Sequence, residues 1–319
     1  MSEFGNSVGR QSGADSSFLY IGTGRSASTW FFEVLREHPR VFVPLNKGTF
    51  YFSHFYACGR EWYEGFFRTS RTCFVAGEVC EDYLSNQEAL RRIKEYRDDM
   101  RLVCCLRNPY ERAISAWRFL NRNGIETCSL ADQGASRPEI FSMGNYGSQL
   151  EFLFTLFDQE QVLPIIFDDV LAAPREVVKR LYAFLGVDDQ FEPQCASRVS
   201  NANGRPRVRS VARVVNRIHM LSWGPSRVLS NFFGRIKGIR WVRATVRKIL
   251  YDERRVSEDW ARRVEEFPSE VIVRYEEEIT KLEVLLGRRL DHWRAPAAVV
   301  QVAKVNVLRV NAGGKKFVS

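Results

Sequence analysis

Several features that would mark a membrane or secreted protein are missing from this 319-residue chain. No hydrophobic run approaches the length of a membrane-spanning helix. Residues 1–17 are polar and lack the apolar core of a secretion signal, so we expect a disordered leader over residues 1–16. The sequence also shows no internal repeat and no long low-complexity run. These features together are typical of a soluble globular protein.

Paired cysteines and metal ligands are missing as well. The seven cysteines form no Cys-x-x-Cys pair and no metal-ligand spacing, and their odd number argues against a disulfide framework. Cys104 and Cys105 are adjacent in an apolar run, and neighbouring strand residues point to opposite faces, so these two thiols cannot easily pair. We expect reduced thiols and no structural metal.

The sequence does contain enough apolar material for a sizeable core and a surplus of positive charge. Hydrophobic residues make up 45% of the chain, and its length suits one large or two ordinary domains. The formal net charge of +9 favours an anionic partner. Between Arg205 and Arg255 the only acidic residues are Asp252 and Glu253, so this basic segment stands apart from the rest of the chain.

A strand, a loop of small residues and a helix follow one another near the N-terminus. Residues 18–21 form an apolar run, which predicts a short buried strand. Apolar residues then recur at helical spacing from Trp30 until Pro39 ends the pattern. The small loop residues allow close approach of an anion, the helix N-terminus offers unpaired N–H groups, and Arg25, Ser28 and Thr29 add donors. This loop is a candidate phosphate cradle.

A second strand-to-helix junction carries another anion motif. The apolar run at residues 102–106 leads into Arg-Asn-Pro-Tyr-Glu-Arg-Ala-Ile-Ser at residues 107–115. Pro109 suits the first turn of a helix, so Arg107 lies at the carboxyl end of the strand and Ser115 follows about two helical turns later. Because ligands of open α/β sheets bind beyond the carboxyl ends of the strands, both junctions can face one nucleotide.

Together the two motifs resemble those of the sulfotransferase superfamily, whose members use 3′-phosphoadenosine 5′-phosphosulfate (PAPS). In that family Lys or Arg followed by Ser/Ala-Gly-Thr/Ser-Thr holds the 5′-phosphosulfate, and residues 25–29 match this pattern with Ala27 in place of the Gly. The family motif Arg-Asn-Pro-x-x-Arg-Ala-x-Ser holds the 3′-phosphate through its first Arg and last Ser, which correspond to Arg107 and Ser115. The similarity, notably to bacterial and heparan-type members, extends over residues 18–293.

The resemblance implies an α/β fold of three layers, with a central parallel sheet, a P-loop-like cofactor site and a helical, basic C-terminal part. We expect one sulfotransferase domain over residues 17–296, which contains the basic segment 205–255, and a C-terminal tail over residues 297–319. Ser257–Phe267 and Pro268–Leu286 are interpreted as two amphipathic helices. Golgi members of the superfamily carry an N-terminal anchor that we do not find here, so we expect a cytoplasmic protein.

The family chemistry implies in-line transfer of a sulfuryl group to an acceptor hydroxyl or amine without a metal, so positioning and charge stabilisation dominate. Arg25 would bridge the leaving phosphate and the sulfuryl group, where many members have Lys. The expected cofactor-binding residues are Arg25, Ser26, Ala27, Ser28, Thr29, Trp30, Arg107, Ser115, Gly204, Arg205 and Arg207. The acceptor is a small molecule, lipid or carbohydrate that the sequence does not identify, and neither does it give the oligomeric state.

The position that supplies the catalytic base in many related members is Gly48 in this chain. Those members have a Glu there, and they often have a Lys where this chain has Val79. Glu78 is our first candidate for the base because it lies at a predicted strand end near the cofactor strands, with an ion pair to Arg112 as an alternative role. Further candidates are His54 and Glu81 for the base and Lys47 for charge stabilisation.

A late turn, Asn203-Gly204-Arg205-Pro206-Arg207, resembles the loop that covers the 3′-phosphate side of the cofactor in relatives. We interpret the basic segment 205–255 as a lid or an acceptor channel. General surface charge is an alternative, as is nucleic-acid binding, although we expect no nucleic-acid partner.

Two other functions are compatible with parts of the sequence. A P-loop nucleotide kinase would use a similar strand-loop-helix, but no Gly-Lys-Ser/Thr follows the first loop, so the usual Mg²⁺ arrangement is missing. A non-catalytic protein that binds an anionic partner would explain Gly48 and Val79, but it would not explain why Arg25, Arg107 and Ser115 are present. The sequence therefore predicts a PAPS-dependent sulfotransferase.

Overall fold

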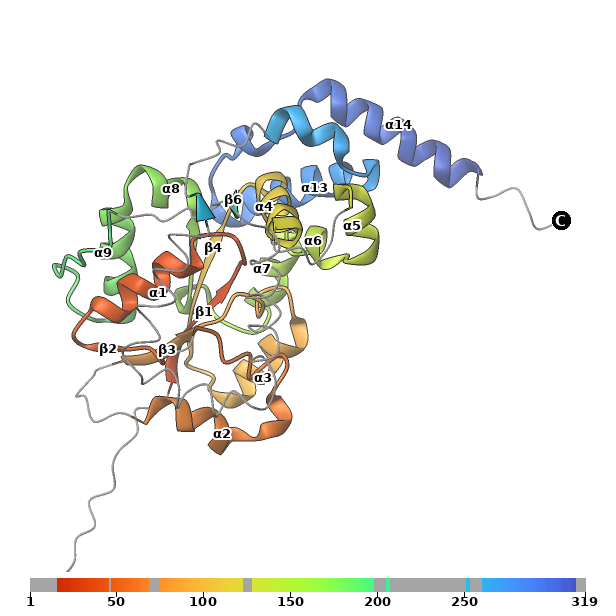
Figure 1. Ribbon diagram of the computed structural model, residues 1–319. Helices are drawn as coiled ribbons and strands as arrows, with labels where there is room; N and C mark the ends of the chain where they lie inside the picture. Colours follow the sequence, from red (N-terminus) through yellow and green to blue (C-terminus); the bar gives the residue numbers. More distant parts are fainter. Residues whose placement is uncertain are drawn as a thin grey trace, which may run out of the picture.

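A five-stranded parallel sheet forms the centre of the molecule (Figure 1). The computed structural model describes residues 16–45, 47–68, 75–122, 128–197, 205–206, 251–252 and 260–313. The strands are β1 (Ser16–Gly22), β2 (Val41–Phe42), β3 (Val75–Val79), β4 (Arg101–Leu106) and β5 (Val162–Ile166). They lie in the order β2-β3-β1-β4-β5, and each neighbouring pair is parallel. The carboxyl ends of β1 and β4 are therefore adjacent.

The sheet separates two hydrophobic cores, which explains why residues 18–21 of β1 and 102–106 of β4 are continuous apolar runs. Side chains of a strand alternate between the two faces, so Cys104 belongs to one core and Cys105 to the other, as predicted. Ser16, which the sequence placed in the leader, is already part of β1 and is buried. The cysteines of the described ranges are free thiols.

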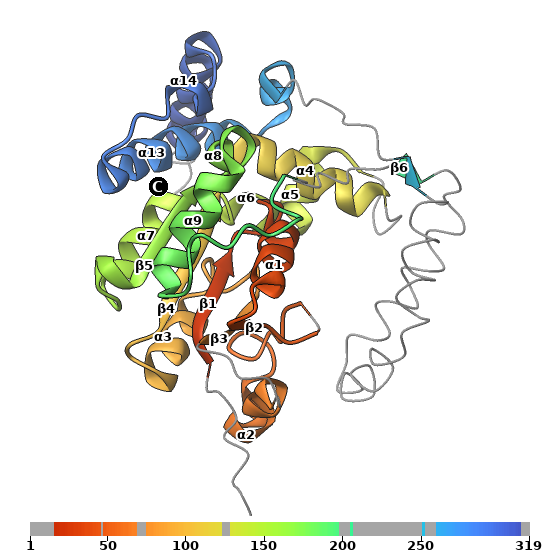
Figure 2. The same ribbon diagram turned by 90° about the vertical axis from the view of Figure 1, so that its left-hand side faces the viewer.

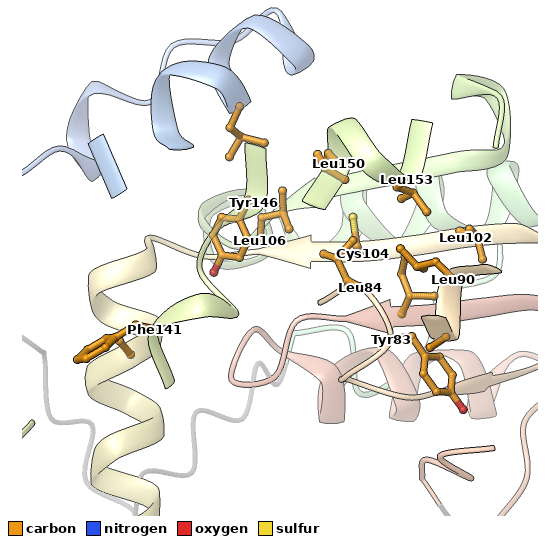
Figure 3. Close-up of a cluster of buried hydrophobic side chains, with 14 of the residues drawn as sticks. Tyr83, Leu84, Leu90, Leu102, Cys104, Leu106, Phe141, Tyr146, Leu150 and Leu153 are labelled. Atoms are coloured by element: carbon orange, nitrogen blue, oxygen red, sulfur yellow. The ribbon is translucent and has the colours of Figure 1, made fainter. Parts of the chain in front are cut away.

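Helices cover both faces of the sheet and complete three layers. One face packs against α1 (Ser28–Glu37), α8 (Phe167–Ala172) and α9 (Pro174–Leu185), which lie toward the viewer in Figure 2. The other face packs against α3 (Gln87–Tyr96), α4 (Pro109–Arg122), α7 (Tyr146–Phe154) and α13 (Ser269–Leu286). On this face Leu102, Cys104 and Leu106 of β4 lie near Leu150 and Leu153 of α7 (Figure 3). The predicted strand at 102–106 and the predicted helix start at Pro109 are both confirmed.

The remaining described elements are short or peripheral. They are α2 (Arg60–Glu64), α5 (Leu130–Ser136), α6 (Glu139–Ser142), α14 (Ala297–Gly313), the antiparallel pair β6 (Arg205–Pro206) and β7 (Tyr251–Asp252), and the 3-10 helices Tyr56–Cys58, Gly65–Phe67, Gln159–Gln161, Trp260–Glu266 and Asp291–Trp293. Apart from β6 and β7, the basic segment lies outside the described residues, as do Gly204 and Arg207.

The C-terminal part is helical where it is described. The helix predicted at 268–286 is confirmed as α13, which packs on α7 and α14. The helix predicted at 257–267 is described only from Trp260, where it forms a 3-10 helix rather than an α-helix. Pro268 explains why this helix ends before Phe267, because the residue that precedes a proline is disfavoured in the α conformation. Residues 297–319, expected to be a tail, contain α14, whose Ala303 is buried.

Candidate active site

The loop between β1 and α1 is held by hydrogen bonds from inside the molecule. The Thr23 and Ser26 hydroxyl oxygens lie 2.9 Å apart, and the Tyr20 hydroxyl donates to the Ser26 carbonyl at 2.9 Å. Arg25 and Ala27 adopt left-handed backbone conformations, with φ of 73° and 58°. Non-glycine residues in this region cost about 1–2 kcal/mol each, and such strain is concentrated at ligand-binding sites. The loop is thus fixed in shape and close to the N-terminus of α1.

The first and second anion motifs are in direct contact. The Arg25 Nε donates a hydrogen bond to the Ser115 Oγ at 3.2 Å, although the two residues are 90 positions apart. The Arg107 Nη1 donates to the Arg25 carbonyl at 3.4 Å. The contact arises because β1 and β4 are neighbours in the sheet and both motifs follow the carboxyl ends of these strands. Arg25, Arg107 and Ser115, which the sequence assigned to one site, are therefore brought together.

Arg107 is held by an acid and an aromatic ring. Its Nη2 lies 2.9 Å from the Glu111 Oε2, and its guanidinium lies 4.9 Å from the centre of the Phe167 ring. The Arg107 side chain is only 12% exposed, so its head group has little freedom. An anion that binds Arg107 must share this guanidinium with Glu111.

Ser28, Lys47 and Glu81 form a second polar cluster beside the first loop. The Glu81 Oε2 accepts hydrogen bonds from the Ser28 Oγ at 2.9 Å and from the Lys47 Nζ. The Lys47 Nζ also donates to the Ser28 Oγ at 2.8 Å. Partial burial opposes ionisation of Glu81, but the Lys47 ammonium and the Ser28 hydroxyl outweigh it and lower the pKa of Glu81. Glu81 is therefore a carboxylate at neutral pH.

Glu78 has a different environment from the one expected. It is 1% exposed, and its two oxygens accept hydrogen bonds from the Thr49 amide at 2.7 Å and the Tyr83 hydroxyl at 2.8 Å. Burial raises the pKa of Glu78, while these hydrogen bonds oppose the shift. Its partners are neutral, whereas Arg112 donates to the Ile140 carbonyl. This buried position does not favour Glu78 as the catalytic base. The role of Glu78 as the base stays a prediction.

The other predicted site residues are distributed around the loop. Thr29 is exposed at the start of α1, while Trp30 is 1% exposed and its indole N–H donates to the Ala196 carbonyl at 3.1 Å. The Trp30 side chain therefore belongs to the core. His54 lies at the surface with its Nε2 3.3 Å from the Asp82 Oδ2. Of the late turn at residues 203–207, only the backbone of Arg205 and Pro206 is described.

Several residues that contact the predicted set were not singled out from the sequence, among them Thr23, Phe119 and Glu111. The Thr23 hydroxyl contacts the Ser26 hydroxyl. The Phe119 ring contacts Arg25, whose guanidinium lies 4.9 Å from the ring centre. No local sequence pattern predicts the contacts of Thr23 and Phe119, because they depend on the fold. Glu111 follows Arg107 by four residues, and this helical spacing of opposite charges was an available signal.

Comparisons with known proteins agree with this geometry. The family model described as "Sulfotransferase domain" matches residues 15–203. Heparan sulfate glucosamine 3-O-sulfotransferase 6 of Mus musculus is 26% identical over 231 residues, which cover 63% of this chain and 66% of that protein. Membrane-associated sulfotransferase kil1 of Dictyostelium discoideum is 30% identical over 105 residues, 32% of this chain and 22% of that protein. The chain thus spans between about a fifth and about two thirds of these curated relatives.

A solved structure supports the fold. The sulfotransferase from Alicyclobacillus acidocaldarius superposes with a TM-score of 0.61 and 20% identity, covering 88% of this chain and 99% of that one. The predicted α/β fold with a central parallel sheet is confirmed. Among the described residues, no helix has both the length and the apolar character needed to cross a membrane. Because the family model matches more than half of its length, the chain belongs to the sulfotransferase domain family.

Proposed function

We propose that this protein transfers a sulfuryl group from PAPS to a hydroxyl or amine of an acceptor. The observation that carries the proposal is the contact between the two anion motifs, in which Arg25 meets both Ser115 and the Arg107 guanidinium. One ligand with two anionic ends requires donors at two separate points of one site. The 5′-phosphosulfate and 3′-phosphate of PAPS meet that requirement.

The donor set fits PAPS by its chemistry. The backbone N–H groups of residues 26–30 at the start of α1, together with the Thr29 hydroxyl, would hold the phosphosulfate end, while the Ser28 hydroxyl donates its hydrogen bond to Glu81. Arg107 and Ser115 would hold the 3′-phosphate, and the late turn with Gly204, Arg205 and Arg207 would cover that end. When bound, PAPS supplies the sulfuryl group. Arg25 keeps its positive charge at any working pH and would stabilise the charge that develops on the leaving oxygen.

A non-catalytic anion-binding protein is the second candidate function. Gly48 supports it, because this position carries no carboxylate. Membership of the sulfotransferase family speaks against the nucleotide kinase that was the other alternative. The acceptor remains a small molecule, lipid or carbohydrate. A cytoplasmic location also stays a prediction, since one relative is named as membrane-associated.

Labelled cofactor separates the two candidate functions. The purified protein is incubated with [³⁵S]PAPS and a metabolite extract of the host, and the labelled products are identified. We expect transfer of label by the wild-type protein and its loss in Arg25→Ala. Binding of 3′,5′-bisphosphoadenosine (PAP), measured by calorimetry, without transfer to any acceptor would favour the non-catalytic function. Absence of both would contradict both candidates.

A further inference from the structure

The backbone at position 48 is poorly suited to any side chain. Gly48 has a φ of +71°, which side-chain-bearing residues rarely adopt. A Cβ at this position would lie 2.8 Å from the Phe50 Cε2, closer than real Cβ contacts. Phe50 itself has a positive φ of 55°. A carboxylate at position 48 would therefore require both backbone strain and movement of the Phe50 ring, so a base must come from another position.

Three carboxylates lie at the carboxyl end of β3 and just after it, and of these only Glu81 contacts the loop between β1 and α1. Glu78 is buried, and it accepts hydrogen bonds from the Thr49 amide and the Tyr83 hydroxyl. Asp82 faces away, toward the Ser53 hydroxyl and His54. Glu81 lies along the loop. Its Oε2 is 2.9 Å from the Ser28 Oγ, and a Cβ added to Gly24 would meet its Cγ at 3.9 Å.

Access and charge also suit Glu81. Its side chain is 37% exposed, so an acceptor can reach it without opening the core. A bare carboxylate beside a phosphosulfate would repel it, but the Lys47 ammonium is paired with Glu81 and cancels the charge of the cluster. Lys47 and the Ser28 hydroxyl converge on the same oxygen, Oε2, and thereby fix the carboxyl group against the loop. The pair therefore adds a base without adding net negative charge to the site.

We propose that Glu81 is the general base of the transfer reaction, with Lys47 as the residue that positions it; the assignment rests on the proposed function. As the acceptor oxygen forms its bond to sulfur, its O–H proton passes to a Glu81 carboxylate oxygen. The bond between sulfur and the bridging oxygen breaks, and its electron pair stays on the 5′-phosphate of PAP. The protonated Glu81 then loses its proton to solvent. This chain thus supplies from the segment after β3 the carboxylate that Gly48 lacks.

Glu81→Gln tests the assignment because the amide keeps the size and polarity of the carboxyl group but cannot accept the proton. We expect [³⁵S]PAPS transfer to the acceptor fraction labelled by the wild-type protein to fall about 100-fold or more, a typical effect of removing a general base. The dissociation constant of PAP should stay within about 3-fold. Glu81→Asp should recover part of the rate. Asp82→Asn, the same charge change one residue along, is the matched control and should transfer within about 3-fold of wild type.

The pH profile separates a base from a merely structural acid. Transfer by the wild-type protein should decline as the pH falls and Glu81 becomes protonated. Lys47→Met removes the cation that favours the charged carboxylate, so this decline should begin at a higher pH. Transfer by Glu81→Gln at more than a third of the wild-type rate, or an unchanged profile in Lys47→Met, would overturn the assignment alone. Failure of the wild-type protein to transfer label would overturn the proposed function and this assignment with it.

Discussion

The Arg25 guanidinium donates a hydrogen bond to the Ser115 hydroxyl at 3.2 Å and lies 4.9 Å from the centre of the Phe119 ring. Both partners belong to α4, the helix that follows the second anion motif. Arg25 is thus oriented by the element that also carries Ser115, the expected 3′-phosphate ligand. The two anion motifs are therefore joined by a direct side-chain contact.

Arg25→Ala should lower the rate of sulfuryl transfer far more than it weakens PAPS binding. Arg25 would meet charge that appears only as the bridging oxygen leaves, and removal of one such donor typically costs on the order of 100-fold or more. Single-turnover rates and the PAP dissociation constant separate the two effects. Arg25→Lys is the control and should keep more of the rate, because many family members have Lys here. A loss of less than about 5-fold at saturating substrate would remove Arg25 from the catalytic role.

Arg107→Ala should weaken cofactor binding more than it slows the bound-state reaction. The 3′-phosphate is remote from the transferred group, so the contribution of Arg107 is uniform binding. Loss of a charge-assisted contact should cost about 2–3 kcal/mol in PAP binding. In Glu111→Gln the competing carboxylate is gone, so PAP should bind as tightly as in the wild type or more tightly. Equal affinity of Arg107→Ala and the wild type for PAP would contradict the assignment.

Trp30→Phe should reduce stability and leave the cofactor affinity unchanged. The indole ring is buried, and its N–H hydrogen bond to the Ala196 carbonyl is lost in the variant. Such a loss costs about 1–3 kcal/mol of unfolding free energy, because the carbonyl is left without its buried donor. Urea unfolding measures the cost, and calorimetry with PAP measures the affinity. A clear loss of PAP affinity in the folded variant would instead place the Trp30 side chain at the cofactor.

The sequence was most informative where a local pattern decides the structure. The apolar run and the proline at residues 102–109 predicted a strand followed by a helix, and the small residues after Ile21 predicted a loop. The contact of Arg25 with Ser115 was predicted only as a shared site, because it depends on β1 and β4 being neighbours.

The interior positions of Glu78 and Trp30 could not be predicted in the same way. The burial of these two side chains is set by packing from distant segments of the chain. Thr49 and Tyr83 enclose Glu78, and Ala196 lies against Trp30. The same holds for Glu81, whose pairing with Lys47 joins two segments 34 residues apart.

Glu78 should make the stability of the protein depend on pH in a defined direction. Burial raises the pKa of Glu78 above its ordinary value of 4.5, so the folded protein holds this proton more tightly than the unfolded chain. The corresponding stabilisation is fully present below pH 4.5 and is lost as the pH rises through the pKa of the folded state. The loss amounts to roughly 1.4 kcal/mol for each unit by which the pKa is raised.

Urea unfolding of the wild type and Glu78→Gln at pH 4 and pH 7 tests this linkage, since the amide does not ionise. The wild type should lose stability relative to Glu78→Gln between the two pH values. Tyr83→Phe removes a hydrogen bond that favours the charged carboxylate, so the wild-type trend should become larger in that variant. If the free-energy difference between wild type and Glu78→Gln is constant with pH, Glu78 ionises as readily in the folded protein as in the unfolded chain. If the difference changes in the opposite direction, Glu78 ionises more readily in the folded protein. Either result would contradict the prediction.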